Sequence, residues 1–179
     1  MLGSPNNMCG ICGVVYFNNK LVSDVQIRQM MKKMRHRGPD DEGLLLDGPI
    51  GLGFVRLSIL DLSLLGHQPM FDESRRFAII HNGEVYNYIE LREELKKAGY
   101  IFKSNTDTEV ILKAYIHWGE DCLDKFNGMW AFAIYDKKNK EIFISRDRYG
   151  IKPFYYYMDS YCFMFASEIP PLLEVLPYK

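Results

Sequence analysis

Residues 8–16 of the chain read MCGICGVVY, and this segment decides how the rest of the sequence is interpreted. Apolar and β-branched residues continue from Cys9 to Phe17, which is typical of a buried strand. Cys9 and Cys12 form a CxxC motif at the start of the segment. Because the apolar residues run straight through the motif, we predict that it lies in a strand rather than at a strand-to-helix turn.

The CxxC spacing leaves three interpretations of these thiols. A thioredoxin-type redox pair requires a helix N-terminus, whose dipole lowers the pKa of the reactive thiol, and a strand does not supply one. A structural zinc site needs two further ligands, whereas Cys122 and Cys162 are isolated in the sequence. Small buried thiols are the third interpretation, which suits Cys12 better than Cys9.

Outward from this segment, the sequence alternates between strand and helix patterns. Asp24 and Asp107 are predicted helix N-caps, and Asn87 with Glu90 resembles a capping box. Helices between blocks of antiparallel strands indicate an α+β fold in which sheets and helices are stacked. The predicted strands are 9–17, 43–46, 50–55, 77–81, 129–136, 141–147, 154–158 and 161–166.

The composition limits the class of protein. A chain of 179 residues is expected to form one domain and to bury about 70% of its unfolded surface. Its 22 Lys and Arg against 23 Asp and Glu argue against a nucleic acid or an anionic membrane as partner. No apolar run approaches the roughly 20 residues of a membrane helix, and the first eight residues do not resemble a signal peptide. Four cysteines are too few for a disulfide scaffold, so we expect a reducing cytoplasm.

Three polar features could bind a small molecule, although each also has a purely structural interpretation. Arg56 follows a predicted strand, where its guanidinium could clamp a carboxylate or form a loop salt bridge. Asn82-Gly83 is expected to end a strand as a hairpin turn, or to supply the donors of an oxyanion hole. Asp107 could cap a helix or hold the ammonium group of a ligand.

Eight segments, taken in order, resemble the glutaminase domain of asparagine synthetases, a class II glutamine amidotransferase and N-terminal-nucleophile hydrolase. The resemblance covers nearly the whole chain, from Met8 to about Glu168, and implies a four-layer αββα sandwich. The segments are MCGICGVV (8–15), RHRGPDDEG (35–43), VRLSILDLS (55–63), HNGEVYN (81–87), NTDTEVI (105–111), GMWAFAIYD (128–136), SRDRYGIKPFYY (145–156) and FASE (165–168).

Local differences favour the asparagine synthetase branch over relatives such as glucosamine-6-phosphate synthase. Leu57-Ser58-Ile59 follows the arginine, where those relatives would show an aromatic or Thr-rich stretch. Two departures from the family pattern are Phe54-Val55, where members commonly carry a histidine, and Ile169-Pro170-Pro171, which replaces the usual helix opening. The synthetase domain with its SGGxDS pyrophosphate loop is absent from the sequence, so the chain is expected to be a fragment, an excised domain or a stand-alone glutaminase.

The resemblance implies that Cys9 attacks the side-chain amide of glutamine and forms a thioester as ammonia leaves. The family uses the α-amine of the cysteine itself as the base. An α-amine with a pKa of about 7.7–8.0 can take the proton of a thiol with a pKa of about 8.5 at a cost of roughly 1 kcal/mol or less. A peptide nitrogen cannot, since its lone pair is delocalised. Cys9 is therefore expected to act only after the Met8–Cys9 bond is cut.

Met1–Met8 is expected to be a disordered leader or an artificial extension, with the glutaminase domain spanning 9–179. Three interpretations of the extra residues compete. Met1–Asn7 could be a start-site artefact preceding the true initiator, Met8; they could be a propeptide; or the domain could be an inactive relic. The first is favoured, because MCGI has the form of a native start.

The resemblance also implies roles for the polar candidates. Asn82 and the N–H of Gly83 are expected to stabilise the oxyanion, Arg56 to bind the α-carboxylate of glutamine and Asp107 its α-ammonium. No metal is implied for this half-reaction. The remaining pocket residues implied are Leu57, Ser58, Ile59, Leu60 and Glu84.

The expected partners are glutamine and a synthetase domain, in cis or in trans, which would bind ATP and magnesium; a homodimer of the full-length protein is possible. Aspartate is the default acceptor of the ammonia, although the family also includes enzymes of polysaccharide and antibiotic pathways. Two rival functions stay open: an inactive module that docks a partner, and a redox protein that uses Cys9 and Cys12.

Overall fold

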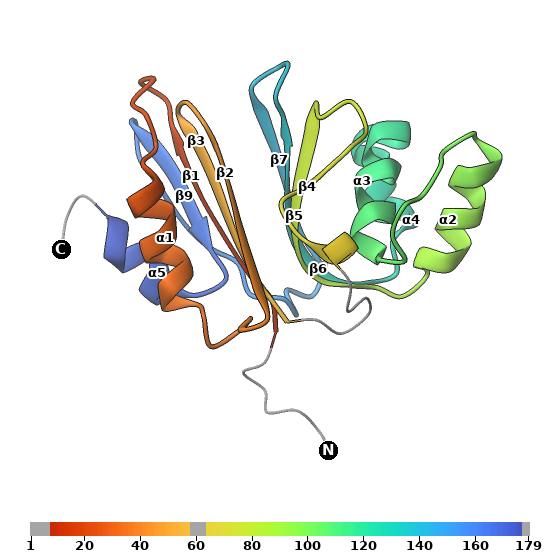
Figure 1. Ribbon diagram of the computed structural model, residues 1–179, viewed down its shortest axis with the longest axis horizontal. Helices are drawn as coiled ribbons and strands as arrows, with labels where there is room; N and C mark the ends of the chain where they lie inside the picture. The colour runs from red at the N-terminus through yellow and green to blue at the C-terminus, as the bar shows by residue number, and fades with distance from the viewer. Residues whose placement is uncertain (1–7, 58–63, 177–179) are drawn as a thin grey trace.

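Two antiparallel sheets stack face to face in the computed structural model, and helices cover the outer face of each (Figure 1). The structure describes residues 8–57 and 64–176. Within that range the layers follow the order helix, sheet, sheet, helix, which is the αββα sandwich predicted above. None of the helices in the described ranges is long and apolar enough to cross a membrane.

The first sheet has the strand order β2-β3-β1-β9-β8, with every neighbouring pair antiparallel. Its central strand β1 is the segment that begins next to Cys9, so the sequence correctly predicted a strand there. The strands are β1 (Gly10–Tyr16), β2 (Asp41–Asp47), β3 (Ile50–Arg56), β8 (Tyr155–Met158) and β9 (Cys162–Ala166).

The second sheet has the order β4-β5-β6-β7 and is also antiparallel. Its long central strands β5 and β6 pair over their whole length, from Phe77 opposite Asp136 to Val85 opposite Gly128. The strands are β4 (Met70–Phe71), β5 (Phe77–Val85), β6 (Gly128–Asp136) and β7 (Glu141–Arg146).

The helices divide between the two outer faces. Those on the first sheet are α1 (Asp24–Lys33) and α5 (Ile169–Val175), and those on the second are α2 (Tyr88–Lys97), α3 (Asp107–Trp118) and α4 (Cys122–Lys125). Short 3-10 turns are η1 (Leu64–Gly66) and η2 (Gly119–Asp121). Helix α5 forms even though it begins Ile169-Pro170-Pro171, because proline is tolerated in the first turn, where no intrahelical N–H bond is lost.

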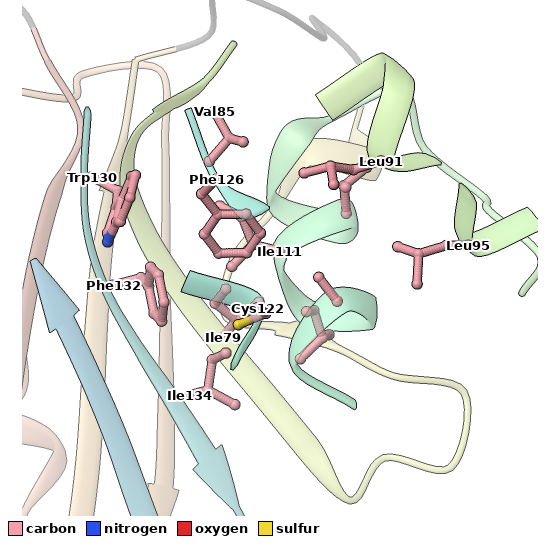
Figure 2. Packing of buried hydrophobic residues seen from close by; sticks show 13 residues of the cluster. Ile79, Val85, Leu91, Leu95, Ile111, Cys122, Phe126, Trp130, Phe132 and Ile134 are labelled. Atoms are coloured by element: carbon pink, nitrogen blue, oxygen red, sulfur yellow. The ribbon is translucent and has the colours of Figure 1, made fainter. Parts of the chain in front are cut away.

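Hydrophobic clusters fill the three spaces between the layers. Between the sheets lie residues of both, among them Ile11, Phe54, Ile80 and Phe165. A second cluster joins the first sheet to α1 and α5. Figure 2 shows the third, in which residues of the second sheet pack against those of α2, α3 and α4: Ile79, Leu91, Ile111, Cys122, Phe126, Trp130, Phe132 and Ile134 are among its members.

The prediction that Asn82-Gly83 ends a strand is wrong. β5 continues through both residues to Val85, with Asn82 opposite Ala131 and Gly83 opposite Trp130 in β6. A Cβ on Gly83 would collide with the carbonyl oxygen of Met129, so a glycine is needed here for the close approach of two strands. The Asn-Gly pair therefore serves strand pairing and not a turn.

Two of the predicted helix caps are displaced by one residue. Ser23, not Asp24, caps α1, and its Oγ accepts the N–H of Gln26 at 3.2 Å. Thr106, not Asp107, caps α3. In both cases a hydroxyl residue precedes an aspartate, and the aspartate becomes the first helical residue, where its charge suits the helix dipole.

The predicted capping box at Asn87 is also wrong. Asn87 occupies the N-cap position of α2 without a side-chain cap hydrogen bond. Its side chain instead donates to the carbonyl of Lys125 at 2.9 Å and accepts the N–H of Asn127 at 2.9 Å. It thus ties α2 to the segment that leads into β6.

Candidate active site

A cavity of about 310 Å³ lies where the start of β1, the end of β3 and the last part of β5 come together. Segments far apart in the sequence contribute to it, including the first residues of α3 and the loop between β7 and β8. Its lining residues are Met8, Cys9, Phe54, Arg56, Leu57, Gly66, Gln68, His81, Asn82, Gly83, Glu84, Thr106, Asp107, Thr108, Met129 and Lys152.

Cys9 is half-buried and is held through both its thiol and its backbone. The N–H of Leu57 donates to Sγ at 3.4 Å, and the thiol donates to the carbonyl of Leu57 at 3.6 Å. Nε of Arg37 donates a hydrogen bond to the carbonyl of Cys9 at 3.1 Å. Nη1 of Arg37 donates in turn to Oε1 of Glu168 at 2.9 Å. The thiol is therefore oriented before any ligand binds.

The surroundings of Cys9 act on its pKa in opposite directions. Burial raises the pKa of the thiol, and this effect outweighs the others. The hydrogen bond from Leu57 and the positive charges of Arg56 and Lys152 lower the pKa, whereas the charge of Asp107 raises it. The thiol of the described chain thus keeps its proton at neutral pH and needs a base to become a nucleophile.

Cys12 is separated from Cys9 by the sheet itself. Side chains alternate between the faces of a strand, so residues three apart point to opposite sides. Cys9 packs with the cluster between the sheets, whereas Cys12 is fully buried against α1. Burial raises the pKa of Cys12 to about 12. This geometry contradicts a redox pair and agrees with the interpretation of Cys12 as a buried thiol. In the described ranges no group of His, Cys, Asp and Glu is arranged to hold a metal ion.

Asn82 faces the same inter-sheet space as Cys9, since it lies two residues after Ile80 of the inter-sheet cluster. The side chain is 1% exposed, and its Nδ2 has no hydrogen-bond partner among the described residues. An unpaired buried donor of this kind costs about 1–3 kcal/mol. Such a donor at a cavity wall is suited to bind an oxygen of a ligand.

Arg56 and Asp107 place opposite charges in the cavity. Arg56 is the last residue of β3 and is buried; Gly66 packs so closely on its guanidinium that a Cβ there would collide with Nη2. Asp107 is 4% exposed, and its Oδ2 accepts the N–H of Val85 at 3.0 Å. This bond fixes the carboxylate of α3 against the end of β5.

Residues that the sequence analysis did not identify support β5 from the side of α3. His81 Nδ1 lies 3.1 Å from Oγ1 of Thr108, which also accepts a bond from Gln68 Nε2 at 3.3 Å. The N–H of His81 donates to Oε1 of Gln68 at 2.6 Å. Burial lowers the pKa of His81, so its imidazole stays neutral. No sequence pattern links these three residues, although His81 directly precedes Asn82.

The structure thus brings Cys9, Arg56, Leu57, Glu84 and Asp107 into one cavity with the Asn82-Gly83 pair. Ser58, Ile59 and Leu60, the other expected pocket residues, lie outside the described residues. Lys152 and Met8 also line the cavity and were not expected there.

Comparison with known proteins identifies the family. The sequence model of the glutamine amidotransferase domain matches residues 8–179. The chain is 48% identical to a putative glutamine-hydrolyzing asparagine synthetase 2 of Methanocaldococcus jannaschii, over 94% of this chain and 35% of that protein. It is 44% identical to asparagine synthetase 1 of Bacillus subtilis, over 93% of this chain and 27% of that protein.

A solved structure matches the fold. The glutamine phosphoribosylpyrophosphate amidotransferase of B. subtilis, complexed with ADP and GMP, superposes with a TM-score of 0.80 at 20% sequence identity. The match covers 93% of this chain and 43% of that one. Against its asparagine synthetase relatives, the chain spans about a third of their length or less and corresponds to their amidotransferase part. It belongs to the glutamine amidotransferase domain family and is homologous to the glutaminase domains of asparagine synthetases.

Proposed function

We propose that this domain hydrolyses glutamine to glutamate and ammonia, with Cys9 as the nucleophile. The observation that supports this most is Nδ2 of Asn82, which has no hydrogen-bond partner within the described part of the chain and is buried at the wall of the cavity that holds the Cys9 thiol. A buried donor without a partner can bind a ligand oxygen directly, because no hydrogen bond within the protein has to break first. The same cavity carries one fixed cation and one fixed anion, which suits a zwitterionic amino acid.

Substrate binding would use the two charges of the cavity. The guanidinium of Arg56 can grip the α-carboxylate of glutamine with two parallel hydrogen bonds. The carboxylate of Asp107 would hold the α-ammonium, and Glu84 adds negative charge to the same wall. With both ends of the amino acid fixed, its side-chain amide is directed to Cys9.

The first chemical step would transfer the thiol proton to the α-amine of Cys9 while Sγ attacks the amide carbon. Negative charge then develops on the amide oxygen, where Asn82 Nδ2 and the N–H of Gly83 would donate. Collapse of this intermediate breaks the C–N bond, and the nitrogen takes the proton from the α-ammonium and leaves as ammonia. A thioester between Cys9 and the glutamyl group remains, and attack of water on it yields glutamate and the free thiol.

This mechanism requires a free amine on Cys9. His81 is the one imidazole among the described residues that line the cavity. It faces the α3 side of β5, and its Nδ1 lies 3.1 Å from Oγ1 of Thr108, so we do not assign it as the base. The described chain carries Met8 on the nitrogen of Cys9. Cleavage of the Met8–Cys9 bond is therefore part of the proposal.

The test is a measurement of products from glutamine by protein that begins at Cys9. Glutamate and ammonia are expected in equal amounts, each detected by an independent assay. Binding of glutamine with no release of ammonia would overturn the proposal and favour an inactive module that docks a partner.

The ammonia is proposed to serve amide synthesis by a synthetase domain, with aspartate as the default acceptor. The support is homology: the relatives are glutamine-hydrolyzing asparagine synthetases about three to four times as long as the matched region. That domain, in the same chain or another, would bind ATP and magnesium, and the reaction is expected in the cytoplasm.

Substrate recognition can be tested by substitutions at the two charged residues of the cavity. Asp107→Asn is expected to weaken glutamine binding by about 2–5 kcal/mol, because it takes the charge from a pair with the substrate ammonium in a buried site. Arg56→Lys is expected to raise KM as well, since lysine keeps the charge but lacks the planar fork. Both variants should keep most of their kcat. KM, kcat and melting temperature are measured for each.

Asp24→Asn is the matched control for Asp107→Asn. Asp24 is also the first residue of a helix behind a hydroxyl cap, but it lies on the outer face of the first sheet. Both substitutions remove the same favourable interaction with a helix dipole, whereas only the change at Asp107 is expected to raise KM. An unchanged KM in Asp107→Asn would leave that residue a purely structural role at the end of β5.

A further inference from the structure

Lys152 is a buried ammonium that the mechanism above does not use. It lies in the loop between β7 and β8, is 7% exposed and lines the cavity beside Cys9. A lysine this buried is unusual unless a charge or a ligand accompanies it. In the described ranges no carboxylate forms an ion pair with its Nζ.

The loop holds the backbone of Lys152 in place from both sides. Arg146 donates from Nε to the carbonyl of Lys152 at 2.7 Å and from Nη2 to that of Gly150 at 2.6 Å. Gly150 has a φ of 63°, which glycine adopts readily. The carboxylate of Asp147 also fixes this loop. It accepts hydrogen bonds at 2.9–3.2 Å from four backbone N–H groups, those of Trp130, Tyr149, Ile151 and Lys152.

The side chain of Lys152 contacts the side chain of Met8, the residue that precedes Cys9. Its Nζ lies 3.1 Å from Sδ of Met8, the residue that carries the Cys9 nitrogen. A thioether is a weak acceptor, so this contact does little for a buried ammonium. Met8, Cys9 and Lys152 line the same cavity, so removal of Met8 ends this contact and frees the α-amine of Cys9 in the cavity that Lys152 lines.

We propose that Lys152 is a positioning residue of the glutaminase site, whose ammonium keeps the α-amine of Cys9 unprotonated and ready to act as base. This role rests on the proposed function of Cys9. The repulsion between two cations disfavours the ammonium form of the amine, and the thiolate that forms during proton transfer is attracted to the same charge.

The other charged groups around the cavity agree with this role. Burial lowers the pKa of Lys152, and the charge of Arg37 lowers it further, whereas the carboxylates of Glu84 and Asp147, and Cys9 in its thiolate form, raise it. Of the groups that raise the pKa of Lys152, Glu84 on β5 has the largest effect. On the side of Cys9, Arg56 adds to the effect of Lys152, and Asp107 from α3 opposes it.

The sign of the pH effect follows from charge. An ordinary α-amine has a pKa of about 7.7–8.0 and is mostly protonated at neutral pH. Cations within about 4–6 Å of an amine lower its pKa by about one unit or more, and Lys152 lines the same cavity as Cys9. Without the charge of Lys152 the pKa of the amine rises. On acidification the amine is then protonated at a higher pH, and the acid limb of kcat/KM moves to higher pH.

The experiment compares four forms of the protein beginning at Cys9: wild type, Lys152→Met, Lys152→Arg and Lys140→Met. In Lys152→Met the acid limb of kcat/KM is expected to move up by about one pH unit, with a loss of about fivefold at pH 7 and about tenfold well below it. Lys152→Arg keeps the charge and should keep the limb near its wild-type position. Lys140 lies in the β6–β7 hairpin, paired with Asp47, and its substitution should not move the limb.

A second readout does not depend on turnover. The rate at which iodoacetamide alkylates Cys9, followed by mass spectrometry across pH, reports the pKa of the thiol. That pKa is expected to rise in Lys152→Met and to stay in place in Lys152→Arg. Lys152→Gln replaces the methionine variant if the latter melts at a much lower temperature.

The outcomes separate this inference from the proposed function. Wild-type pH limbs for both kcat/KM and alkylation in Lys152→Met would overturn the role of Lys152 and leave Cys9 as the nucleophile. Absence of glutamine hydrolysis in the wild type would overturn the proposed function, and the alkylation profile would still decide whether Lys152 acts on Cys9.

Discussion

Replacing Cys9 with alanine is expected to abolish glutamine hydrolysis, with a loss of about 10⁴-fold or more in kcat. Alanine has no group that can form the thioester, and the oxyanion donors cannot replace a missing nucleophile. The folded structure should persist, because the cavity already leaves Cys9 half-exposed and its backbone bond to Arg37 is kept. Glutamine should still bind, since Arg56 and Asp107 are unchanged. Ammonia release and glutamine binding are measured on the same preparation.

Cys12→Ser is the matched control. It changes a thiol three residues away that faces α1 rather than the cavity. Its glutaminase activity should follow the amount of folded protein. Wild-type turnover in Cys9→Ala would contradict the assignment of the nucleophile, and loss of activity per folded molecule in Cys12→Ser would return both thiols to a shared role.

Asn82→Ala is expected to lower kcat by about 100- to 1000-fold, the usual effect of removing one oxyanion donor. The stability should respond differently from the activity. Because Nδ2 of Asn82 has no partner among the described residues, its removal takes away an unsatisfied buried group and not a hydrogen bond. We therefore expect a melting temperature close to that of the wild type beside a large loss of turnover.

Asn139→Ala, in the exposed hairpin between β6 and β7, is the control for this substitution. It should leave both kcat and KM at wild-type values. If Asn82→Ala raises KM and leaves kcat intact, Asn82 binds the ground state of the substrate and the oxyanion assignment fails.

Most of the fold could be predicted from local patterns in the sequence. The continuous apolar run after Cys9 identifies β1, and Ile27, Met30 and Met31 at helical spacing identify the buried face of α1. Such patterns report burial directly, because each element must hide its apolar face. Stacked sheets and helices followed from the order of these elements.

The errors arise where a local signal competes with a distant one. Asn-Gly is a strong local signal for a hairpin, yet β6 pairs with β5 through and beyond Asn82 and Gly83. That pairing joins residues almost 50 positions apart and leaves no local trace. The caps at Ser23 and Thr106 were missed because serine, threonine and aspartate are all favoured N-cap residues. The sequence pattern therefore did not distinguish each hydroxyl residue from the aspartate that follows it.

The residues of the site could be predicted from the family resemblance, and only some of them from physical patterns in the sequence. Cys9, Arg56 and Asn82 share the inter-sheet face, as strand alternation requires once the strands are aligned. Lys152 reaches the cavity from a loop whose shape depends on Asp147 and Arg146, so its place could not be read from spacing. The roles given to Ser58, Ile59 and Leu60 stay predictions.

The free α-amine of Cys9 is the central claim, and its direct test compares two forms of the protein that differ only in Met8. One begins at Cys9; the other keeps Met8 attached, as verified by the intact mass. Ammonia release from glutamine is measured for both at equal concentrations of folded protein. We predict turnover only in the form that begins at Cys9, because only that form has a nitrogen able to accept the thiol proton. Equal turnover by the form that keeps Met8 would contradict the account.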